Sequence, residues 1–308
     1  MKESTRSFTT PCGREMKYFE WLPDDQQTAC VQIVHGMAEH AARYRHFAEY
    51  LTQKGFAVYA SDHFGHGMTA GVIQNAGHFD DEQGWNKNTD ALISFSKIII
   101  KDKPTIPLFL LGHSMGSLFA RDMISTEGAL YKAVVISGTL FTPAMLLQAG
   151  HFISSVQKIF MGKRHLSHLL HKMTFGPNNK NIRNPLTPFD WLSHAPAICD
   201  AYQKDSFCGF VCTTQFYKDL FHGISNVQRK NNMKAIPDAL PILIISGKED
   251  PVGQFGKGVK MVHQLLMGAG KNISELQLLD GMRHEILNEV EREKVYSLVY
   301  SFFMSKSN

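Results

Sequence analysis

The sequence predicts an α/β protein with a mostly parallel central sheet, flanked by helices, and a helical segment inserted between two strands. Short apolar runs alternate with longer amphipathic segments, and this rhythm is typical of a parallel sheet covered by helices. The rhythm stops near residue 139 and resumes near residue 238. With 308 residues, 44% of them apolar, the chain is long enough to bury a large core together with such an insertion.

Six apolar runs are expected as strands because each is short and bounded by turn residues. They cover residues 30–34, 57–60, 108–111, 133–136, 242–245 and 276–279. Helices are expected where apolar residues recur every three or four positions. These segments cover residues 41–53, 86–101, 115–126, 255–267 and 286–303. Residues 16–21 predict an additional leading strand at an antiparallel edge.

The interruption of the rhythm divides the chain into three parts. Residues 1–138 and 238–308 are expected to form the α/β core, and residues 139–237 an inserted helical cap. Within the cap, residues 145–160 have the apolar spacing of an amphipathic helix, and basic residues follow at 163–165. One interpretation is a helix that packs on the core. The alternative is a lipid-facing entrance with its basic residues near headgroups.

Charge and composition exclude several classes of protein. The net charge of +4 is spread along the chain without a run of Lys or Arg, so nucleic acid is not expected as a partner. The N-terminal segment has no apolar signal region, and no stretch is apolar enough for a membrane span. Five scattered cysteines fit neither a disulfide framework nor a zinc motif. These features predict a cytoplasmic protein with reduced thiols.

The sequence GHSMG at residues 112–116 joins the strand expected at 108–111 to the helix expected at 115–126. A serine between two glycines at such a junction is typical of the nucleophile turn of the α/β-hydrolase fold. Glycines are needed there because side chains would collide in so tight a turn. The turn also places the serine at a helix N-terminus, where the helix dipole and the free N–H of Met115 stabilise an oxyanion. Ser114 is therefore the predicted nucleophile.

A serine nucleophile needs a histidine base, which in this fold lies near the end of the chain. The chain has 15 histidines, so their presence alone is uninformative. His284 follows the last expected strand, residues 276–279, and precedes the final expected helix, residues 286–303. This order and placement predict that His284 is the base.

The base in turn needs a carboxylate that orients it, in the loop after the preceding strand. Residues 242–245 form that strand, and Asp250 follows it in the loop. Asp250 is therefore the predicted acid. Glu249 is the nearest rival, and Asp280 is a second rival, although its place at a strand end suits a turn-capping role.

The second donor to an oxyanion normally comes from the loop after an early strand that enters the site. That strand is expected at residues 30–34 and is followed by His35 and Gly36. Since Gly36 permits close backbone approach, the N–H of Met37 is the predicted donor opposite that of Met115. The side chain of Met37 matters less than its amide.

No metal is expected in this site. The histidines and glutamate of residues 35–40 are spaced HxxxEH, which fits neither zinc-helix motif. The segment at residues 284–288 lacks the second histidine of HExxH. The chemistry predicted from Ser114 and His284 is ester hydrolysis through an acyl-enzyme, and it requires no cofactor.

The sequence resembles the monoacylglycerol lipase and lysophospholipase branch of the α/β-hydrolases, a group also described as serine-aminopeptidase-like hydrolases. The resemblance covers the core at matching order and spacing. The matching segments are HGMAEHAARY at 35–44, SDHFGHGMTAG at 61–71, LFLLGHSMGS at 108–117, SGKEDPVG at 246–253 and DGMRHEILNE at 280–289. It implies the triad Ser114, Asp250 and His284 and the oxyanion donors Met37 and Met115.

Three further points follow from the resemblance. The family's Asp-x-x-Gly-His-Gly stretch falls on residues 62–67, where structural roles near the site are implied for Asp62, Gly65, His66 and Gly67. The family usually has a second glycine after GHSMG, whereas this chain has Ser117. The cap resembles the lipid-specific enzymes only loosely.

The leading substrate class is a monoacylglycerol or lysophospholipid, because the resemblance and an apolar cap both favour a medium or long acyl chain. A second hypothesis keeps the triad but changes the reaction to that of a peptidase of the proline-iminopeptidase kind or an acyltransferase. A third is a non-catalytic module that binds a ligand in the pocket. The expected partners are a small ester or lipid substrate and, transiently through the cap, a membrane surface.

Overall fold

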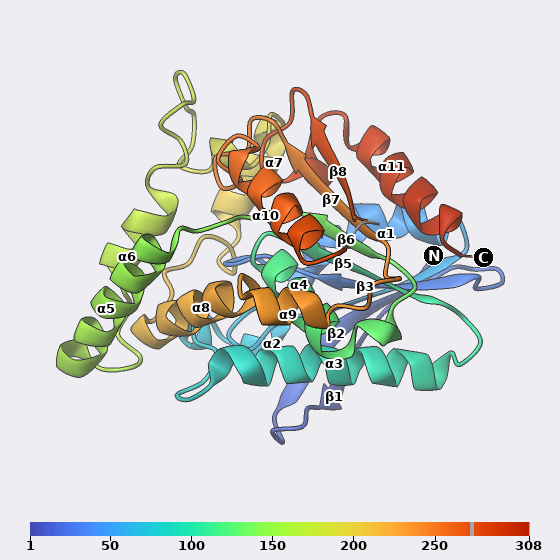
Figure 1. Ribbon diagram of the computed structural model, residues 1–308, viewed down its shortest axis with the longest axis horizontal. Coiled ribbons are helices and arrows are strands. Elements are labelled where there is room, and N and C mark those ends of the chain that lie inside the picture. The colour runs from blue at the N-terminus through green and yellow to red at the C-terminus, as the bar shows by residue number, and fades with distance from the viewer. Residues whose placement is uncertain (272–273, 308) are drawn as a thin grey trace.

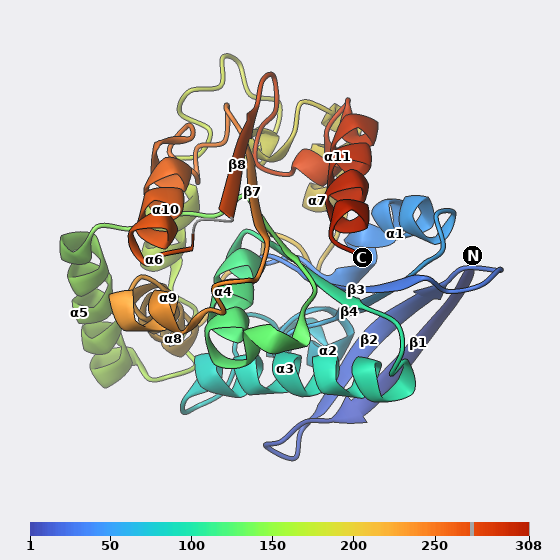
Figure 2. The same ribbon diagram turned by 45° about the vertical axis from the view of Figure 1, so that its right-hand side comes forward.

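The apolar runs of the sequence form one twisted sheet in the computed structural model, which describes residues 1–271 and 274–307. Within these residues the sheet has eight strands in the order β1-β2-β4-β3-β5-β6-β7-β8. Its twist is seen in Figures 1 and 2. The strands are β1 (Lys2–Thr9), β2 (Glu15–Leu22), β3 (Ala29–Val34), β4 (Phe56–Ser61), β5 (Leu108–His113), β6 (Val134–Ser137), β7 (Ile242–Gly247) and β8 (Ser274–Leu279). From β4 to β8 all neighbouring strands are parallel, whereas β1 and β2 are antiparallel. The predicted mostly parallel sheet is therefore confirmed.

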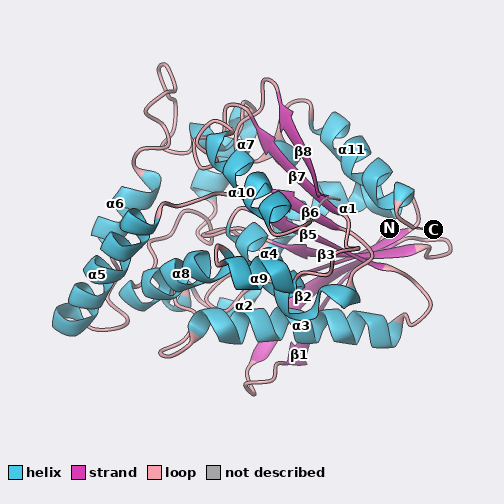
Figure 3. Cartoon of the chain, in the orientation of Figure 1, coloured by secondary structure: helices cyan, strands magenta, loops and turns pink. Residues whose placement is uncertain are grey.

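Helices cover both faces of the sheet, as Figures 2 and 3 show. They are α1 (Arg45–Thr52), α2 (Gly67–Ala70), α3 (Gly84–Asp102), α4 (Met115–Glu127), α5 (Ala144–Met161), α6 (His168–Phe175), α7 (Pro196–Lys204), α8 (Thr214–Val227), α9 (Lys230–Ala235), α10 (Lys257–Gly268) and α11 (Arg292–Ser305). α1 and α11 pack on one face, and α3, α4, α8 and α10 contribute to the core on the other. Strands buried on both faces read as continuous apolar runs, which is why the sequence reveals them.

The predicted leading strand is present as β2, but it does not lie at the edge of the sheet. β1 pairs with it from Lys2 opposite Leu22 to Thr9 opposite Glu15 and forms the edge. β1 is polar and mostly exposed, so it lacks the apolar signal of the other strands. Its Phe8 nevertheless stacks on Phe95 of α3, with ring centroids 5.0 Å apart.

The helix expected at residues 286–303 is divided in two. A short 3-10 helix spans Ile286–Asn288, and α11 begins at Arg292. Between them the chain is extended at Glu289, whose carboxylate accepts hydrogen bonds from the backbone N–H groups of Arg283 and His194. These bonds hold Glu289 against the neighbouring loops, and the helical pattern of the sequence does not reveal them.

The segment between β6 and β7 contains helices α5 to α9 and an isolated bridge between Leu166 and Thr213. α5 lies farthest from the sheet and packs along α8 (Figures 1 and 2). Across the described residues, no helix is both long and apolar enough to cross a membrane. Because β6 and β7 are parallel, the segment leaves the carboxyl end of β6, where the loops of the pocket gather, and returns to β7 at the opposite edge of the sheet.

Candidate active site

A cavity of about 510 Å³ lies where the parallel strands end. Ser114 directly follows β5 and His284 comes after β8, and both line the cavity. Met37 lies in the loop after β3, and Pro251 in the loop after β7. Ligands of open α/β sheets bind in this place, outside the carboxyl ends of the strands. The sheet therefore gathers residues that are up to about 250 positions apart around one pocket.

The backbone at Ser114 is strained, with φ of 53° and ψ of −120°. Its N–H donates to the carbonyl of Ser137 over 2.9 Å, which ties the turn to β6. A Cβ atom at Gly112 would lie 2.3 Å from the carbonyl oxygen of Gly116, and one at Gly116 would lie 2.0 Å from that of Val34. Only glycine fits at these two positions, so the two glycines of the motif are dictated by packing.

Ser117, at the position where the family usually has a glycine, is fully buried behind the turn. Its hydroxyl donates to the carbonyl oxygen of Ser114 over 2.5 Å. The N–H of Ser117 donates to the same oxygen over 2.9 Å. The extra hydroxyl therefore adds a hydrogen bond to the first turn of α4.

His284 and Asp250 lie side by side in the interior. Nδ1 of His284 is 3.0 Å from Oδ2 of Asp250, although the ring N–H does not point straight at that oxygen. Asp250 is fully buried, and its oxygens also accept hydrogen bonds from the hydroxyl of Ser246 over 3.1 Å and the N–H of Val252 over 2.8 Å. The carboxylate is thus fixed from two further sides while it faces the imidazole.

The two rival acids point to other partners. Glu249 pairs with His194 over 2.9 Å, and its side chain is half exposed. Asp280 pairs with Lys248 over 2.6 Å at the surface. The structure therefore brings Asp250, and neither rival, beside His284.

The protonation of His284 is governed by opposing effects. Burial alone would lower the pKa of its imidazole, but Asp250, and to a smaller extent Glu285 and Glu39, raise that pKa above its usual range. His113 lies next to it, with ring centroids 4.8 Å apart. Burial and the neighbouring His284 lower the pKa of His113 to about 4, so His113 stays neutral at pH 7.

The loop after β3 approaches the serine closely. A Cβ atom at Gly36 would lie 3.2 Å from the Cβ of Ser114 and 2.7 Å from a carboxylate oxygen of Glu39. The N–H of Gly36 donates to that same glutamate oxygen over 2.5 Å. Within the described part of the chain, the N–H groups of Met37 and Met115 donate to no other group, so both remain available to a ligand.

The Asp62–Gly67 segment supports this loop from the core side. Asp62 accepts hydrogen bonds from the N–H groups of Ala41 and Met68, each over 2.8 Å. His66 accepts one from the N–H of Ala38 over 3.3 Å. The geometry therefore gives both residues the structural role that the sequence implied.

The sequence analysis did not foresee a buried ionic cluster beside the pocket. Arg43 donates to both oxygens of Glu285, one bond measuring 2.7 Å, and to Glu39 over 2.7 Å. Burial would raise the pKa of Glu39, yet Arg43 holds that pKa below its usual range, so Glu39 stays charged. Glu39 and Glu285 line the cavity.

The rest of the cavity wall is mostly apolar. Side chains from the segment between β6 and β7 supply much of it, including Leu146 of α5, Met173 of α6 and Phe221 and Ile224 of α8. The pocket therefore combines an apolar wall with a polar patch at Glu39 and Glu285. Its volume falls within the range of about 300–1,000 Å³ that is usual for small-molecule sites.

One group of potential metal ligands occurs among residues 1–271 and 274–307. His40, Asp205 and Cys208 offer ligand atoms that lie within 4.8 Å of one another. None of the three belongs to the Ser114, His284 and Asp250 arrangement.

One family model matches most of the chain, and several known proteins are similar to it. The model of the family described as serine aminopeptidase, S33, matches residues 25–291. A monoacylglycerol lipase from Mycolicibacterium smegmatis is 27% identical over 99% of both chains. A monoglyceride lipase from Rattus norvegicus is 28% identical over 88% of this chain and 80% of that protein. A carboxyl esterase from Bacillus coagulans, solved in complex with glycerol, is 29% identical over all of both chains, with a TM-score of 0.90.

Proposed function

Because the chain belongs to the serine aminopeptidase S33 family, we propose that it is a lipid esterase whose substrates are monoacylglycerols. The broader class follows from the family and from its esterase and lipase relatives: the chain is a serine hydrolase with the α/β-hydrolase fold that cleaves carboxylic esters. One observation carries the narrower proposal. Ser114 and His284 lie in a cavity that has an apolar wall and a charged polar patch. A long acyl chain and a hydroxyl-bearing head group are matched by these two regions.

In the proposed reaction, His284 accepts the proton of the Ser114 hydroxyl as its oxygen attacks the ester carbonyl. The N–H groups of Met37 and Met115 stabilise the oxyanion of the tetrahedral intermediate. When the intermediate collapses, the C–O bond to the leaving alcohol breaks and the alcohol takes the proton from His284. Asp250 orients the imidazole and stabilises its charged form. An acyl group then remains on Ser114.

Water completes the cycle in the second half-reaction. His284 takes a proton from the water as its oxygen attacks the acyl carbonyl, and then returns that proton to the serine oxygen as the ester bond breaks. The fatty acid leaves and Ser114 is regenerated. All proton transfers use side chains of this chain, so we propose no cofactor or metal for the reaction itself.

The substrate proposal is tested by comparing kcat/KM for three sets of compounds. These are monoacylglycerols of increasing chain length, short-chain p-nitrophenyl esters and aminoacyl amides. We expect the highest values for monoacylglycerols with medium or long chains. Faster cleavage of the amides would contradict the lipase proposal and favour a peptidase. Absence of labelling by a fluorophosphonate probe would instead favour a non-catalytic binding role.

We further propose that α5 contacts a lipid surface. Only a narrow stripe of α5, Leu147, Gly150 and Ser154, is buried. A Cβ atom at Gly150 would lie 2.7 Å from the ring of Phe221, so this glycine lets α5 lie close against α8. Apart from Leu147 and the partly buried Ile153, the large apolar side chains of the helix are exposed. Those most exposed are Met145, Leu146, Phe152, Ile159, Phe160 and Met161, with exposed fractions of 55–82%.

Such a face suits an interface between water and lipid, where apolar side chains enter the acyl region. The double variant Phe152→Ser and Phe160→Ser is expected to bind phosphatidylcholine vesicles less and to show a higher KM for vesicle-dispersed monoacylglycerol. Its kcat/KM for a soluble short-chain ester should stay unchanged. Val290→Ser, which removes an exposed apolar side chain from the loop before α11, is the matched control. Equal vesicle binding by all three proteins would refute the lipid contact.

A cytoplasmic location is also part of the proposal. All five cysteines are free, and four of them are buried. Burial raises the pKa of Cys30 to about 12 and that of Cys199 to about 11, so these thiols stay protonated and inert. Unpaired thiols suit a reducing compartment. Fractionation of cells that express the tagged protein tests this, and secretion would contradict it.

A further inference from the structure

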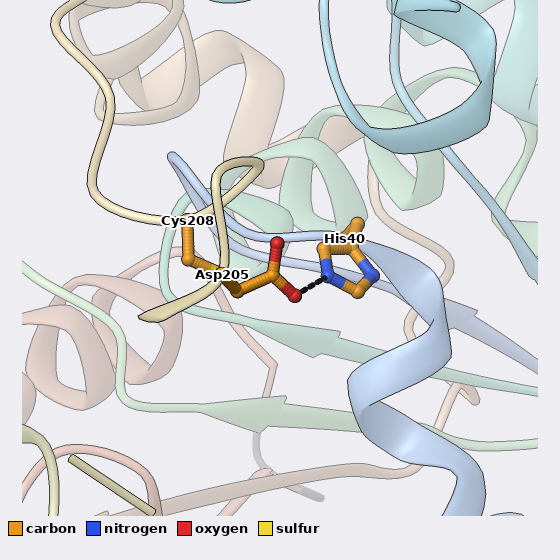
Figure 4. A group of neighbouring side chains, drawn as sticks. All are labelled: His40, Asp205 and Cys208. Atoms are coloured by element: carbon orange, nitrogen blue, oxygen red, sulfur yellow. Dashed lines mark hydrogen bonds and ion pairs between the residues drawn. The ribbon is translucent and has the colours of Figure 1, made fainter. Parts of the chain in front are cut away.

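Three side chains with metal-binding chemistry meet at the boundary between the β3 loop and the segment after α7. Figure 4 shows His40, from the loop after β3, beside Asp205 and Cys208. Nε2 of His40 is 2.9 Å from Oδ2 of Asp205, and the Sγ of Cys208 completes a group whose ligand atoms all lie within 4.8 Å. The absence of a local zinc motif in the sequence does not bear on this group, because His40 and Asp205 are 165 positions apart.

We propose that His40, Asp205 and Cys208 bind a zinc ion, and that the bound ion inhibits ester hydrolysis. Imidazole nitrogen, thiolate sulfur and carboxylate oxygen are the ligands that zinc prefers, and water can supply a fourth. On binding, the thiol proton of Cys208 passes to solvent, and the neutral imidazole of His40 binds through Nε2 while its proton resides on Nδ1, since the coordinating atoms must be deprotonated. The inhibitory effect rests on the proposed esterase function, whereas metal binding does not.

The local backbone already holds two of the ligands together. The N–H of Phe207 donates to Oδ1 of Asp205 over 2.8 Å, and that of Cys208 donates to the Asp205 carbonyl over 3.0 Å. This turn directs the other carboxylate oxygen, Oδ2, toward His40. Cys208 is 8% exposed, and the side chains of His40 and Asp205 are 16% and 37% exposed, so an ion can enter from the Asp205 side.

The surrounding charges do not repel a cation. Arg43 is the positive group that lowers the pKa of Cys208, against the larger raising effect of burial. Arg43 is bonded to both Glu39 and Glu285, so its charge is more than balanced by two buried carboxylates. Asp205 adds a third negative charge. A divalent ion would therefore enter a region of net negative charge.

The site is linked directly to the predicted oxyanion loop. The carbonyl of Ala38 accepts hydrogen bonds from the N–H of Gly209 over 2.9 Å and from the hydroxyl of Tyr202 over 2.7 Å. Gly209 follows Cys208, and Ala38 lies between Met37 and His40 in this loop. A tetrahedral zinc ion holds its ligand atoms roughly 3.3–3.7 Å apart, whereas Nε2 of His40 and Oδ2 of Asp205 are now 2.9 Å apart. Fitting the ligands around zinc therefore moves His40 relative to the segment of Asp205 and Cys208, and this movement displaces Ala38 and with it the adjacent N–H of Met37.

The first test measures hydrolysis of a soluble short-chain ester at free zinc concentrations fixed by a metal buffer. We expect zinc to inhibit the wild type, and Cys208→Ala and Asp205→Asn to need at least about tenfold more zinc for half-inhibition. Cys12→Ala, which removes an exposed thiol, is the matched control and should behave as the wild type. Equal inhibition of Cys208→Ala would place the ion elsewhere, for instance on His284, and would overturn the proposal.

The second test detects the metal without using activity. Cobalt(II) bound to a thiolate gives a near-ultraviolet charge-transfer band. We expect this band in the wild type, in Cys12→Ala and in the inactive Ser114→Ala variant, and its loss in Cys208→Ala and His40→Ala. Thermal unfolding of each variant checks that it is folded. A band that persists in Cys208→Ala, or is absent from the wild type, overturns the site. A band without any esterase activity would uphold the site and refute the proposed function.

Discussion

At Ser114, backbone strain and the placement of the hydroxyl have the same origin. A φ of 53° is costly for a residue with a Cβ, by about 1–3 kcal/mol, and persists only where packing enforces it. Here β5 ends at His113 and α4 begins at Met115, so a single residue reverses the chain direction. The same reversal places the side chain on the cavity wall at the N-terminus of a helix.

Because the strain lies in the backbone at Ser114, two replacements of the serine should have the same effect on activity but different effects on stability. Both Ser114→Ala and Ser114→Gly should lower kcat on the order of 10⁴- to 10⁶-fold and abolish fluorophosphonate labelling. Ser114→Ala keeps the strained backbone and should unfold at the wild-type temperature. Ser114→Gly relieves the strain and should be more stable by about 1 kcal/mol. Activity assays and calorimetry test both, and a destabilised glycine variant would argue against strain at this position.

The pH dependence of kcat/KM should follow His284. The base must be neutral to accept a proton, so activity falls as pH drops through the pKa of His284 in the free enzyme. Because nearby carboxylates raise that pKa, the acid limb of the wild type is expected above pH 6.5. Asp250→Asn removes the largest raising effect and should move the limb to lower pH.

The same variant should also lose about 10⁴-fold in kcat, because the imidazole is no longer held in the productive tautomer. Glu249→Gln is the matched control, since Glu249 pairs with His194 instead. If the acid limb of the kcat/KM profile of Asp250→Asn stays at the wild-type pH, or if that of Glu249→Gln shifts equally, Asp250 does not set the pKa of His284.

The site residues differ in how readily they could be predicted from the sequence. Ser114 lies in a motif whose strand and helix context is local, and His284 and Asp250 follow from the order of strands. The contact of Arg43 with Glu285 joins residues 242 positions apart, and no local pattern encodes it. A buried ion pair is recognised only when folding brings both partners into one low-dielectric space.

Among the secondary-structure elements, burial decided which ones could be predicted from the sequence. The parallel strands β3 to β7 were predicted because they are buried on both faces, whereas the edge strand β8 is only partly buried and was predicted from its leucines. β1 was missed because its residues are polar and its stability comes from backbone pairing with β2. α5 was predicted as a helix, but its exposed apolar side chains could not be separated from core residues by spacing alone.

The close packing of α4 on β3 at Gly116 can be tested by substitution. In Gly116→Ala, the new methyl group would lie 2.0 Å from the carbonyl oxygen of Val34, so the helix must move away from the strand. We expect a loss of about 1–3 kcal/mol in the free energy of unfolding and a large loss of activity. Gly268→Ala, at the end of α10, is the matched control because nothing lies within 4 Å of its added Cβ. Chemical denaturation measures both, and equal stabilities would contradict the close contact.

At the scale of the whole molecule, the ends of the strands supply the reacting groups, while the segment between β6 and β7 supplies much of the apolar wall. A substitution in this segment should therefore change the selectivity for acyl chains without abolishing the chemical step. Ile224 of α8 lines the cavity and is 5% exposed. In Ile224→Trp the larger ring fills part of the space that we assign to the acyl chain.

We expect kcat/KM of Ile224→Trp to fall at least about tenfold for long-chain monoacylglycerols and to change less than about twofold for an acetyl ester, which needs none of that space. Val290→Trp, an exposed replacement in the loop before α11, is the matched control and should keep the wild-type chain-length profile. An equal loss for long and short esters in Ile224→Trp, with unchanged thermal stability, would mean that this wall does not hold the acyl chain. The acyl chain would then have to lie along another part of the apolar wall, such as that formed by Met173 of α6, because the patch at Glu39 and Glu285 is charged.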